Sequence, residues 1–357
     1  MPATNLRIPG PTRLPDEILG ECSRQMINHR GADFGRLLIE ITDGAREFFG
    51  TSGDVFLLGS SGTGAMEASV VNFLSPGDRV LAIVGGVFAD RTRALAEAFG
   101  LQVEVLKVEL GETVDPEEVK TRLDSGQYRG VFLTQNETST GVTNDVKGVG
   151  EAIGSRDLLF VVDGVSSVGA IPLEMDAWRV DVAFTASQKA LMAPPGAALL
   201  AVTERAWRFA REAACPRFYF DLRSISDALD QGQYPWTPPL PICFALRAAM
   251  ERLASAGLAS VFDRHRQYGE FVRERIVAGG LELFASRASA SNTVTAVRFP
   301  DGADSAAFMA RAQSEHDTIF GSGEGELRGR IFRIGHMGLI DFQPLADAVD
   351  VAARLLK

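Results

Sequence analysis

The residues of this sequence that could do chemistry come directly after short apolar runs. Val55–Leu58 is followed by small residues, Gly59–Gly64, which open a helical pattern and suit an anion such as phosphate. Asp163 ends an apolar run, and Lys189 stands three residues after another, Val180–Ala186. Taken one at a time, the loop is as typical of a tight turn, and the aspartate and lysine are more typical of a helix cap and a solvated side chain.

Taken together, an anion-binding loop, a carboxylate and an amine at neighbouring strand ends describe a pocket for pyridoxal phosphate (PLP). Lys189 would form a Schiff base with the aldehyde, and Asp163 would keep the pyridinium nitrogen protonated. A protonated ring accepts electrons and stabilises the carbanion formed when a substrate loses its Cα proton. A nicotinamide dinucleotide fits less well, because Glu67 stands where its binding loop has a third glycine.

The elements that must position these residues alternate between residues 50 and 205. Several short apolar runs are continuous, which is typical of strands covered on both faces. Helical patterns such as 64–74 and 90–99 lie between the runs. The alternation predicts a mostly parallel α/β sheet that binds ligands at the carboxyl ends of its strands. The predicted strands are Val55–Leu58, Arg79–Val84, Gln102–Val108, Gly130–Thr134, Leu158–Asp163, Val180–Ala186 and Ala197–Val202.

A proline-rich segment, residues 234–241, interrupts this alternation. Its four prolines are incompatible with an interior strand or the middle of a helix. Helical patterns follow at 242–256 and 259–278, and the remainder mixes short strands with helices. We therefore predict a large α/β domain over residues 13–250 and a smaller α+β domain over 251–357. Residues 1–12 could pack on either of them.

Seven segments of the chain resemble a known family. The sequence is similar to the class V aminotransferases of PLP fold type I, and within them to the serine/alanine–glyoxylate and serine–pyruvate aminotransferase group. The segments come in the family's order and span nearly the whole chain. They are Pro9–Thr12, Ser61–Ala68, Asn136–Gly141, Val162–Ser167, Ser187–Leu191, Ala193–Gly196 and Phe332–His336. The resemblance implies a mostly parallel seven-stranded sheet with flanking helices and a smaller C-terminal α+β domain.

The resemblance also implies how the cofactor is held. Lys189 would carry it and then move the proton between the substrate Cα and the cofactor, while Asp163 holds the ring nitrogen. Backbone N–H groups of the small-residue loop and the Thr63 hydroxyl would bind the phosphate. Phe88 would stack on the ring, at a position where the family often has tryptophan or tyrosine. The implied cofactor-binding residues are Thr63, Gly64, Ala65, Phe88, Ser139, Asp163, Val165, Gln188 and Lys189.

Other residues are implied to bind the substrate. The guanidinium of Arg333 would take the α-carboxylate through two parallel hydrogen bonds, helped by the Gly10 N–H and by Ser139. The motifs supply no second arginine for a distal carboxylate, and Arg30 is the only nearby candidate. We therefore expect alanine and serine to be better amino donors than aspartate and glutamate.

A second subunit is implied as well. Tyr234 and Thr237 match residues that reach the phosphate of the neighbouring subunit's cofactor, which would make the protein a homodimer with shared active sites. Trp236 and Pro238 depart from the family's pattern, and this weakens the match. The same stretch, read alone, indicates a surface loop.

The implied activity moves an amino group from alanine or serine to glyoxylate or pyruvate by a ping-pong Schiff-base mechanism. Ureidoglycine–glyoxylate exchange, cysteine desulfuration and lyase chemistry use the same fold and remain open alternatives. Desulfurases usually carry histidine before the lysine, where this chain has Gln188. A PLP-fold subunit without activity is a further alternative, and the intact set of Lys189, Asp163 and Arg333 argues against it.

Composition narrows the possible partners. The formal net charge of −10 argues against nucleic acid and anionic membranes as partners. Three scattered cysteines and four histidines show no disulfide or metal-ligand spacing, so no metal is expected, and His29 and His336 have no assigned role. Without a signal peptide or a long apolar run, we expect a cytoplasmic protein.

Overall fold

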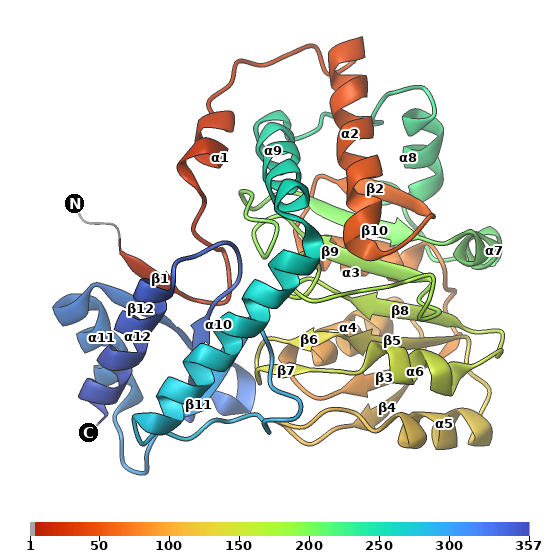
Figure 1. Ribbon diagram of the computed structural model, residues 1–357. Helices are drawn as coiled ribbons and strands as arrows, with labels where there is room; N and C mark the ends of the chain where they lie inside the picture. Colours follow the sequence, from red (N-terminus) through yellow and green to blue (C-terminus); the bar gives the residue numbers. More distant parts are fainter. Residues whose placement is uncertain (1–3, 357) are drawn as a thin grey trace.

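The computed structural model describes residues 4–356, which form two sheets with helices around them (Figure 1). The larger sheet has seven strands, and all pairings among β9, β8, β5, β3 and β4 are parallel. Strand β10 is antiparallel to both β2 and β9. In spatial order the strands are β2 (Asp54–Leu58), β10 (Ala198–Val202), β9 (Val182–Ala186), β8 (Leu159–Asp163), β5 (Gly130–Thr134), β3 (Arg79–Val84) and β4 (Gln102–Lys107). The predicted mostly parallel seven-stranded sheet is confirmed.

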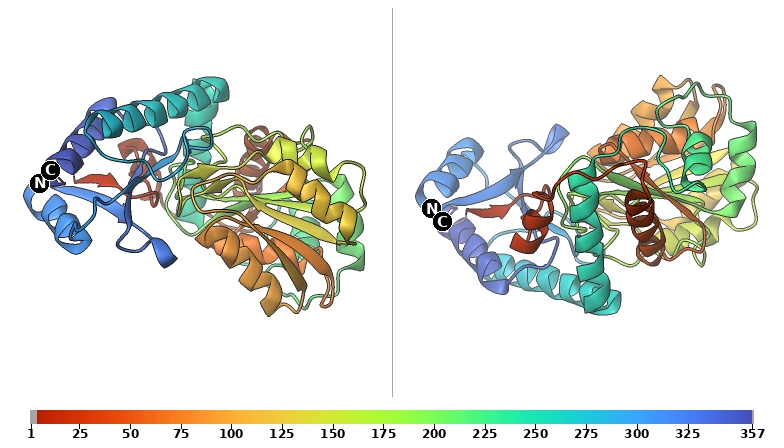
Figure 2. Two further views of the ribbon diagram at one scale, coloured as in Figure 1. Left: turned by 90° about the horizontal axis from the view of Figure 1, so that it is seen from below. Right: turned by 90° about the horizontal axis from the view of Figure 1, so that it is seen from above.

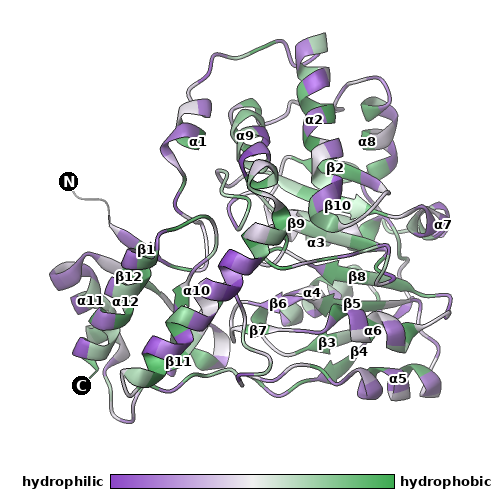
Figure 3. Ribbon diagram, viewed as in Figure 1, coloured by the Kyte–Doolittle hydropathy of each residue, from purple (hydrophilic) through white to green (hydrophobic). Residues whose placement is uncertain are grey.

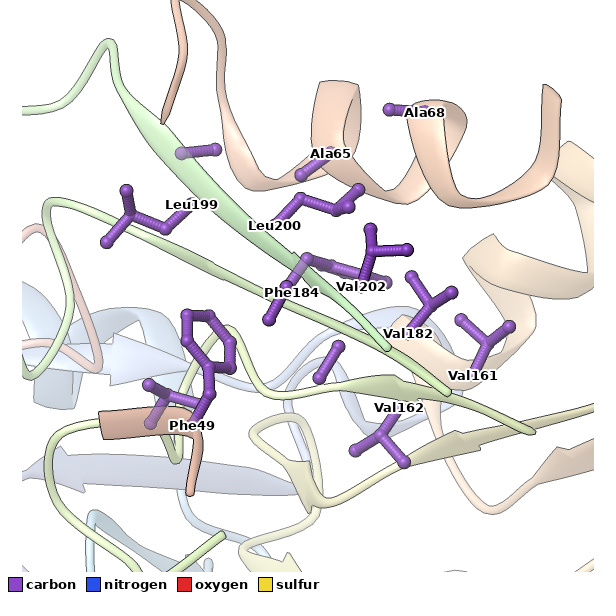
Figure 4. Packing of buried hydrophobic residues seen from close by; sticks show 14 of the residues in the cluster. Phe49, Ala65, Ala68, Val161, Val162, Val182, Phe184, Leu199, Leu200 and Val202 are labelled. Atoms are coloured by element: carbon purple, nitrogen blue, oxygen red, sulfur yellow. The ribbon is translucent and has the colours of Figure 1, made fainter. Parts of the chain in front are cut away.

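Helices cover both faces of this sheet. Ala65 and Ala68 of α3 (Gly62–Val71) lie over β9 and β10, and Phe49 at the end of α2 (Ala32–Phe49) lies on the opposite face (Figure 4). Every residue of β8, β9 and β10 is buried, and these strands are hydrophobic along their length (Figure 3). Burial on both faces explains why their sequences read as continuous apolar runs.

The remaining helices of this region begin at side-chain caps in several cases. Asp115, Asp145, Thr203 and Asp221 each accept a hydrogen bond from a backbone N–H in the first turn of their helix. The capped helices are α5 (Pro116–Ser125), α6 (Val146–Ile153), α7 (Glu204–Glu212) and α8 (Leu222–Leu229). The other two, α1 (Asp16–Glu21) and α4 (Val87–Ala98), begin without a side-chain cap. A short ribbon of β6 (Asn136–Glu137) and β7 (Val142–Thr143) follows β5.

The smaller sheet joins residues from both ends of the sequence. Its order is β1 (Asn5–Arg7), β12 (Thr318–Ser322), β13 (Ile331–Gly335) and β11 (Val294–Arg298). Strand β1 is parallel to β12, while β13 is antiparallel to both β12 and β11. Strand β1 and helix α12, which lie near the two ends of the described residues, are therefore on the same side of the molecule (Figure 2). The helices here are α10 (Leu258–Ala278), α11 (Ser305–His316), α12 (Phe342–Leu355) and the 3-10 turn η1 (Gly325–Leu327).

The buried side chains form two main clusters, and α10 belongs to both. Leu258 and Val261 pack in the core of the large sheet, whereas Tyr268, Val272 and Ile276 pack with the small sheet. Because one continuous helix crosses between the cores, the domain boundary near residue 250 stays a prediction. Among residues 4–356, no helix has both the length and the apolar character needed to cross a bilayer.

The proline-rich segment behaves as predicted over most of its length. It is irregular until α9 (Leu240–Ala256), which starts two residues earlier than expected and includes Pro241 in its first turn. Proline is tolerated there because the first N–H groups of a helix have no partner within the helix.

Candidate active site

A cavity of about 330 Å³ lies where the carboxyl ends of the large sheet face the small sheet. It is lined by Ile8, Pro9, Gly10, Phe88, Thr138, Lys189, Phe320, Gly321, Ser322, Glu324 and Arg333. Only three of these residues are charged: Lys189, Glu324 and Arg333. The structure thus brings the predicted lysine and the predicted substrate arginine into one pocket.

Lys189 lies just after the buried strand β9. Its Nζ donates a hydrogen bond to the Pro9 carbonyl oxygen at 2.7 Å. Burial, together with the smaller effect of the charge of Arg333, lowers the pKa of this amine to about 8. Gly10 packs so closely that a Cβ built on it would lie 2.7 Å from Nζ, and its φ of +116° also favours glycine. The N-terminal segment therefore positions the amine from one side.

Asp163 is the last residue of β8 and is buried. Its Oδ1 accepts a hydrogen bond from the Val165 N–H at 2.8 Å. Burial raises the pKa of this carboxyl to about 7, because the charged form is poorly solvated there. A bound N–H cation, such as a pyridinium, would stabilise the carboxylate. Val165 in turn packs over Gly62, where an added Cβ would lie 2.8 Å from its Cγ2.

The small-residue loop ends at the start of α3, as expected. A Cβ on Gly64 would lie 2.9 Å from the Phe220 Cζ atom, so close packing explains the glycine. The N–H groups of Gly64 and Ala65 already donate to the Ser61 carbonyl oxygen, at 3.0 and 3.3 Å. An anion at this helix start would therefore meet first the N–H groups of Gly62 and Thr63.

Phe88 and Arg91 share one face of α4, next to this loop. Phe88 lines the cavity, and the Arg91 guanidinium carbon lies 4.8 Å from its ring centroid. Arg91 Nη1 is 3.4 Å from the Thr63 hydroxyl oxygen, so it brings a positive charge to the predicted phosphate loop. Sequence reasoning missed Arg91, although its spacing of three residues from Phe88 places both on the same helix face.

Ser139 lies beside the cavity and is tied to a buried acid. Its hydroxyl donates to Glu137 Oε1 at 2.5 Å and accepts from the Val87 N–H at 3.0 Å. Glu137 also accepts the Phe88 and Ala89 N–H groups, so it holds the start of α4. Burial raises the pKa of this carboxyl. The sequence motif contained Glu137, but nothing in the motif indicated that it caps a helix.

Ser139 itself does not line the 330 Å³ cavity. It borders a neighbouring, more apolar cavity of about 470 Å³, which shares Glu324 with the first. Thr138, the preceding residue, lines the first cavity instead. The predicted role of Ser139 near the substrate carboxylate remains a prediction.

Arg333 is buried in the middle of β13 and is held by three groups. Its Nε donates to the Ser322 carbonyl oxygen at 2.9 Å and its Nη1 to the Thr138 carbonyl oxygen at 3.0 Å. Its Nη2 lies 2.5 Å from Glu324 Oε1. Sequence reasoning missed Glu324, because its approach to Arg333 depends on the turn between β12 and β13.

Gln188 precedes Lys189 and points an acceptor into the interior. Its side-chain Oε1 is buried and has no hydrogen-bond partner among the described residues. A buried acceptor without a partner is costly, so a bound polar group at this position would be favourable. This is consistent with the predicted contact between Gln188 and a cofactor.

Tyr234 and Thr237 differ in their surroundings. Tyr234 is 2% exposed, packs in the large core and accepts a hydrogen bond from the Gly59 N–H at 3.3 Å. It therefore contacts the phosphate loop of its own chain and is not part of a surface loop. Thr237 is exposed. Their predicted reach into a neighbouring subunit remains a prediction.

Two of the other candidates have roles outside the cavity. Arg30 donates to the Tyr234 carbonyl oxygen at 2.6 Å, so its guanidinium is directed at the proline-rich segment. His336 is fully buried and contacts Thr295 Oγ1 and the Asn292 carbonyl oxygen, and burial keeps its pKa well below the ordinary value. Within residues 4–356, no cluster of three metal-ligating side chains is found.

Comparison with known proteins agrees with this geometry. The family model described as "Aminotransferase class-V" matches residues 10–319. The L-aspartate–glyoxylate aminotransferase of Paracoccus denitrificans is 38% identical over 338 residues, which cover 93% of this chain and 85% of that protein. The serine–glyoxylate aminotransferase of Methylorubrum extorquens is 36% identical, covering 97% and 89%.

Two further similar proteins are a relative that is named for a different role and a solved structure. The soluble hydrogenase small subunit of a Synechococcus species is 35% identical, covering 98% of this chain and 92% of that protein. The crystal structure of an alanine–glyoxylate aminotransferase from a Nostoc species superposes with a TM-score of 0.96 at 31% identity, covering 100% and 96% of the two chains.

Proposed function

The chain belongs to the class V aminotransferase family, whose members use PLP, and we propose that it transfers the amino group of serine or alanine to glyoxylate. One observation carries this proposal. The buried Arg333 guanidinium and the Lys189 amine line the same cavity, so one small molecule can present a carboxylate to the first and its Cα to the second. Pyruvate is the second-choice acceptor.

The residues around the cavity fit PLP. The carboxyl of Asp163 would hold the ring nitrogen, and the start of α3, with Arg91 nearby, would hold the phosphate. The buried Gln188 Oε1 has no partner among the described residues and could accept a hydrogen bond from the cofactor. Bound there, PLP would supply an electron sink for the carbanion formed at the substrate Cα.

The protein's own side chains would orient the substrate and move its proton. Arg333 would fix the α-carboxylate, since its guanidinium is already held in place by two backbone carbonyls. Because burial lowers the pKa of Lys189 to about 8, about a tenth of this amine is neutral at pH 7 and about half at pH 8, and the neutral form can accept a proton from Cα. Phe88 and Ile8 line the same cavity and would shield the amine from part of the solvent.

The choice of acceptor and the choice of donor rest on different grounds. The aminotransferase relatives described above share glyoxylate in their names, whereas their donors are aspartate, serine and alanine. Family membership therefore favours glyoxylate but leaves the donor to be set by the pocket of this chain. That pocket contains a single arginine.

A panel of donors tests the proposal. We expect kcat/KM with glyoxylate to be highest for L-serine or L-alanine, and to be about a hundred-fold lower for L-aspartate and L-glutamate, because a distal carboxylate would be buried without a partner. Pyruvate should give lower rates than glyoxylate with each donor. Equal or better rates with the dicarboxylic donors would overturn the assignment of the donor.

We also propose a homodimer with shared active sites, because Tyr234 and Thr237 match the family residues that reach the phosphate of a neighbouring subunit. Tyr234 already contacts the phosphate loop of its own chain through the Gly59 N–H. Lys189→Ala subunits mixed with Tyr234→Phe/Thr237→Ala subunits should regain activity, because one hybrid site would carry both native halves. A confirmed heterodimer without activity would contradict shared sites. A cytoplasmic location also remains a prediction, which cell fractionation would test.

A non-catalytic role is the second candidate, because one relative is named as a hydrogenase subunit. Absorbance distinguishes the two. A working enzyme should absorb at about 400–430 nm when loaded with PLP, and this band should shift when L-serine or L-alanine is added. If the absorbance band of the PLP-loaded protein does not shift with any amino donor, the result would support the role as a non-catalytic subunit.

A further inference from the structure

The proposed substrate arginine already has a carboxylate bound to it. Glu324 Oε1 lies 2.5 Å from Arg333 Nη2, on the cavity side of the loop that follows β12. The two side chains are unequally exposed, at 32% for Glu324 and 5% for Arg333. The arginine is fixed by backbone carbonyls from Ser322 and Thr138, whereas the described structure gives the Glu324 carboxylate no other hydrogen bond.

Counting donors shows what an incoming carboxylate would meet. A guanidinium has five N–H donors, and three of those on Arg333 are engaged by Ser322, Thr138 and Glu324. A bidentate carboxylate needs two donors. It can therefore bind beside Glu324 or displace it, and in both cases the negative charge of Glu324 stays within the same small cavity.

The charged groups that line the cavity determine which substrates can bind while Glu324 remains there. Once Lys189 carries the cofactor, Arg333 and Glu324 are the remaining charged groups of the lining. One α-carboxylate can share Arg333 with Glu324. Among the described residues that line the cavity, a second carboxylate on the same substrate would find no further cation, and it would face Glu324 at short range.

We propose that Glu324 is a specificity-determining residue, which occupies Arg333 in the resting pocket and excludes amino acids and oxo acids that carry a second carboxylate. The proposal rests on the proposed function, because it takes Arg333 as the site of the substrate carboxylate. The proposal predicts in particular that L-aspartate is a poor amino donor for this enzyme. A relative at 38% identity is named for L-aspartate, so membership of the family does not itself exclude that donor.

The decisive variant is Glu324→Gln, which keeps the shape and an oxygen acceptor for Arg333 but removes the charge. The loaded enzyme would be titrated in a calorimeter with propionate and with succinate, which carry one and two carboxylates and cannot react. In the variant, succinate should bind at least about ten-fold more tightly than in the parent, and propionate should change by no more than about three-fold. The kcat/KM for L-aspartate relative to L-serine should rise by about ten-fold or more.

Two further variants serve as controls. Glu326→Gln removes an equally negative but exposed residue two positions along the same loop and should leave both ratios unchanged. Glu324→Asp keeps the charge and should retain selection against succinate, which separates the effect of charge from damage to the loop.

The outcomes separate this proposal from the proposed function. If Glu324→Gln leaves the succinate-to-propionate ratio within about two-fold of the parent, Glu324 is not the determinant. If neither L-serine nor L-alanine reacts in any form of the enzyme, the proposed function fails, while the binding ratio still shows whether Glu324 selects against a second carboxylate.

Discussion

The two sides of the cavity are built in different ways. On the large sheet, Asp163 ends β8 and Lys189 follows the adjacent strand β9. Every residue of these two strands is buried, and both strands are paired on both sides. On the small sheet, Arg333 is also held by a buried strand, but its partner Glu324 stands in a loop and is partly exposed. The difference suggests that packing fixes the chemistry, whereas the choice of substrate depends on a side chain that the core does not hold.

The largest effect should come from Lys189, on the side fixed by packing. Lys189→Ala should reduce turnover by about 10⁴-fold or more, because it removes both the attachment point and the base at Cα. The cofactor should still bind through contacts that do not involve the amine. Equilibrium dialysis with PLP and an assay of turnover measure the two effects, and Lys147→Ala, an exposed lysine, is the matched control. Near-parental turnover without added amine would refute the role of Lys189.

Asp163→Asn should have the next largest effect. Asparagine keeps the shape but cannot hold the ring nitrogen protonated, so loss of the Cα proton should slow by about 10²–10³-fold while the fold is retained. Stopped-flow absorbance with L-serine would follow this step, with circular dichroism to check the fold. Asp157→Asn, on an exposed aspartate, should behave like the parent. An unchanged rate would remove Asp163 from the mechanism.

Arg333→Lys tests the small-sheet side of the comparison. Lysine retains the charge that pairs with Glu324 but loses the planar fork, so kcat/KM should fall by about a hundred-fold, with the absorbance of the bound cofactor unchanged. Arg298→Lys changes a more exposed arginine on the neighbouring strand and should have little effect. A loss of cofactor binding in Arg333→Lys would show that the two sides are less independent than the structure indicates.

The smallest effect concerns pH and couples the two sides. Because the pKa of Lys189 is lowered from 10.5 to about 8, the rate at which cofactor-free protein captures PLP should rise with pH and level off above about 8. The charge of Arg333 contributes to this shift, so Arg333→Met should move the midpoint upward. The charged amine also opposes folding, and stability of the cofactor-free protein should therefore rise between pH 8 and 10.5. A capture rate that still increases near pH 10 would show that the pKa of the Lys189 amine is not lowered.

Much of the large sheet could be predicted because its physical signals are local. Continuous apolar runs such as Gly130–Thr134 mark strands buried on both faces, and all seven predicted strands of this sheet are found within two residues of their expected bounds. Asp163 and Lys189 were predictable for the same reason, since Asp163 ends such a run and Lys189 stands three residues after another. A close family resemblance then connected them with Arg333.

The residues that sequence reasoning missed depend on contacts between distant segments. Glu324 meets Arg333 across a hairpin turn, and Arg91 meets Thr63 across two helices. His265 lies in α10 among exposed charged residues, Asp263 and Arg266, which give no local sign that its ring is buried. The ring is buried and accepts a hydrogen bond from the Gly338 N–H at 3.0 Å, a contact that no local pattern indicates.

The pairing of β1 with β12 has a consequence for the order of events during synthesis. Thr318 is synthesised about 300 residues after its partner Asn5. Pro9 and Gly10, which lie against the Lys189 amine, follow directly from that strand. The surroundings of the amine are therefore completed only after β12 has been made. A nascent chain that stops before this strand lacks that environment, so capture of the cofactor in its final form marks a chain that extends at least through β12.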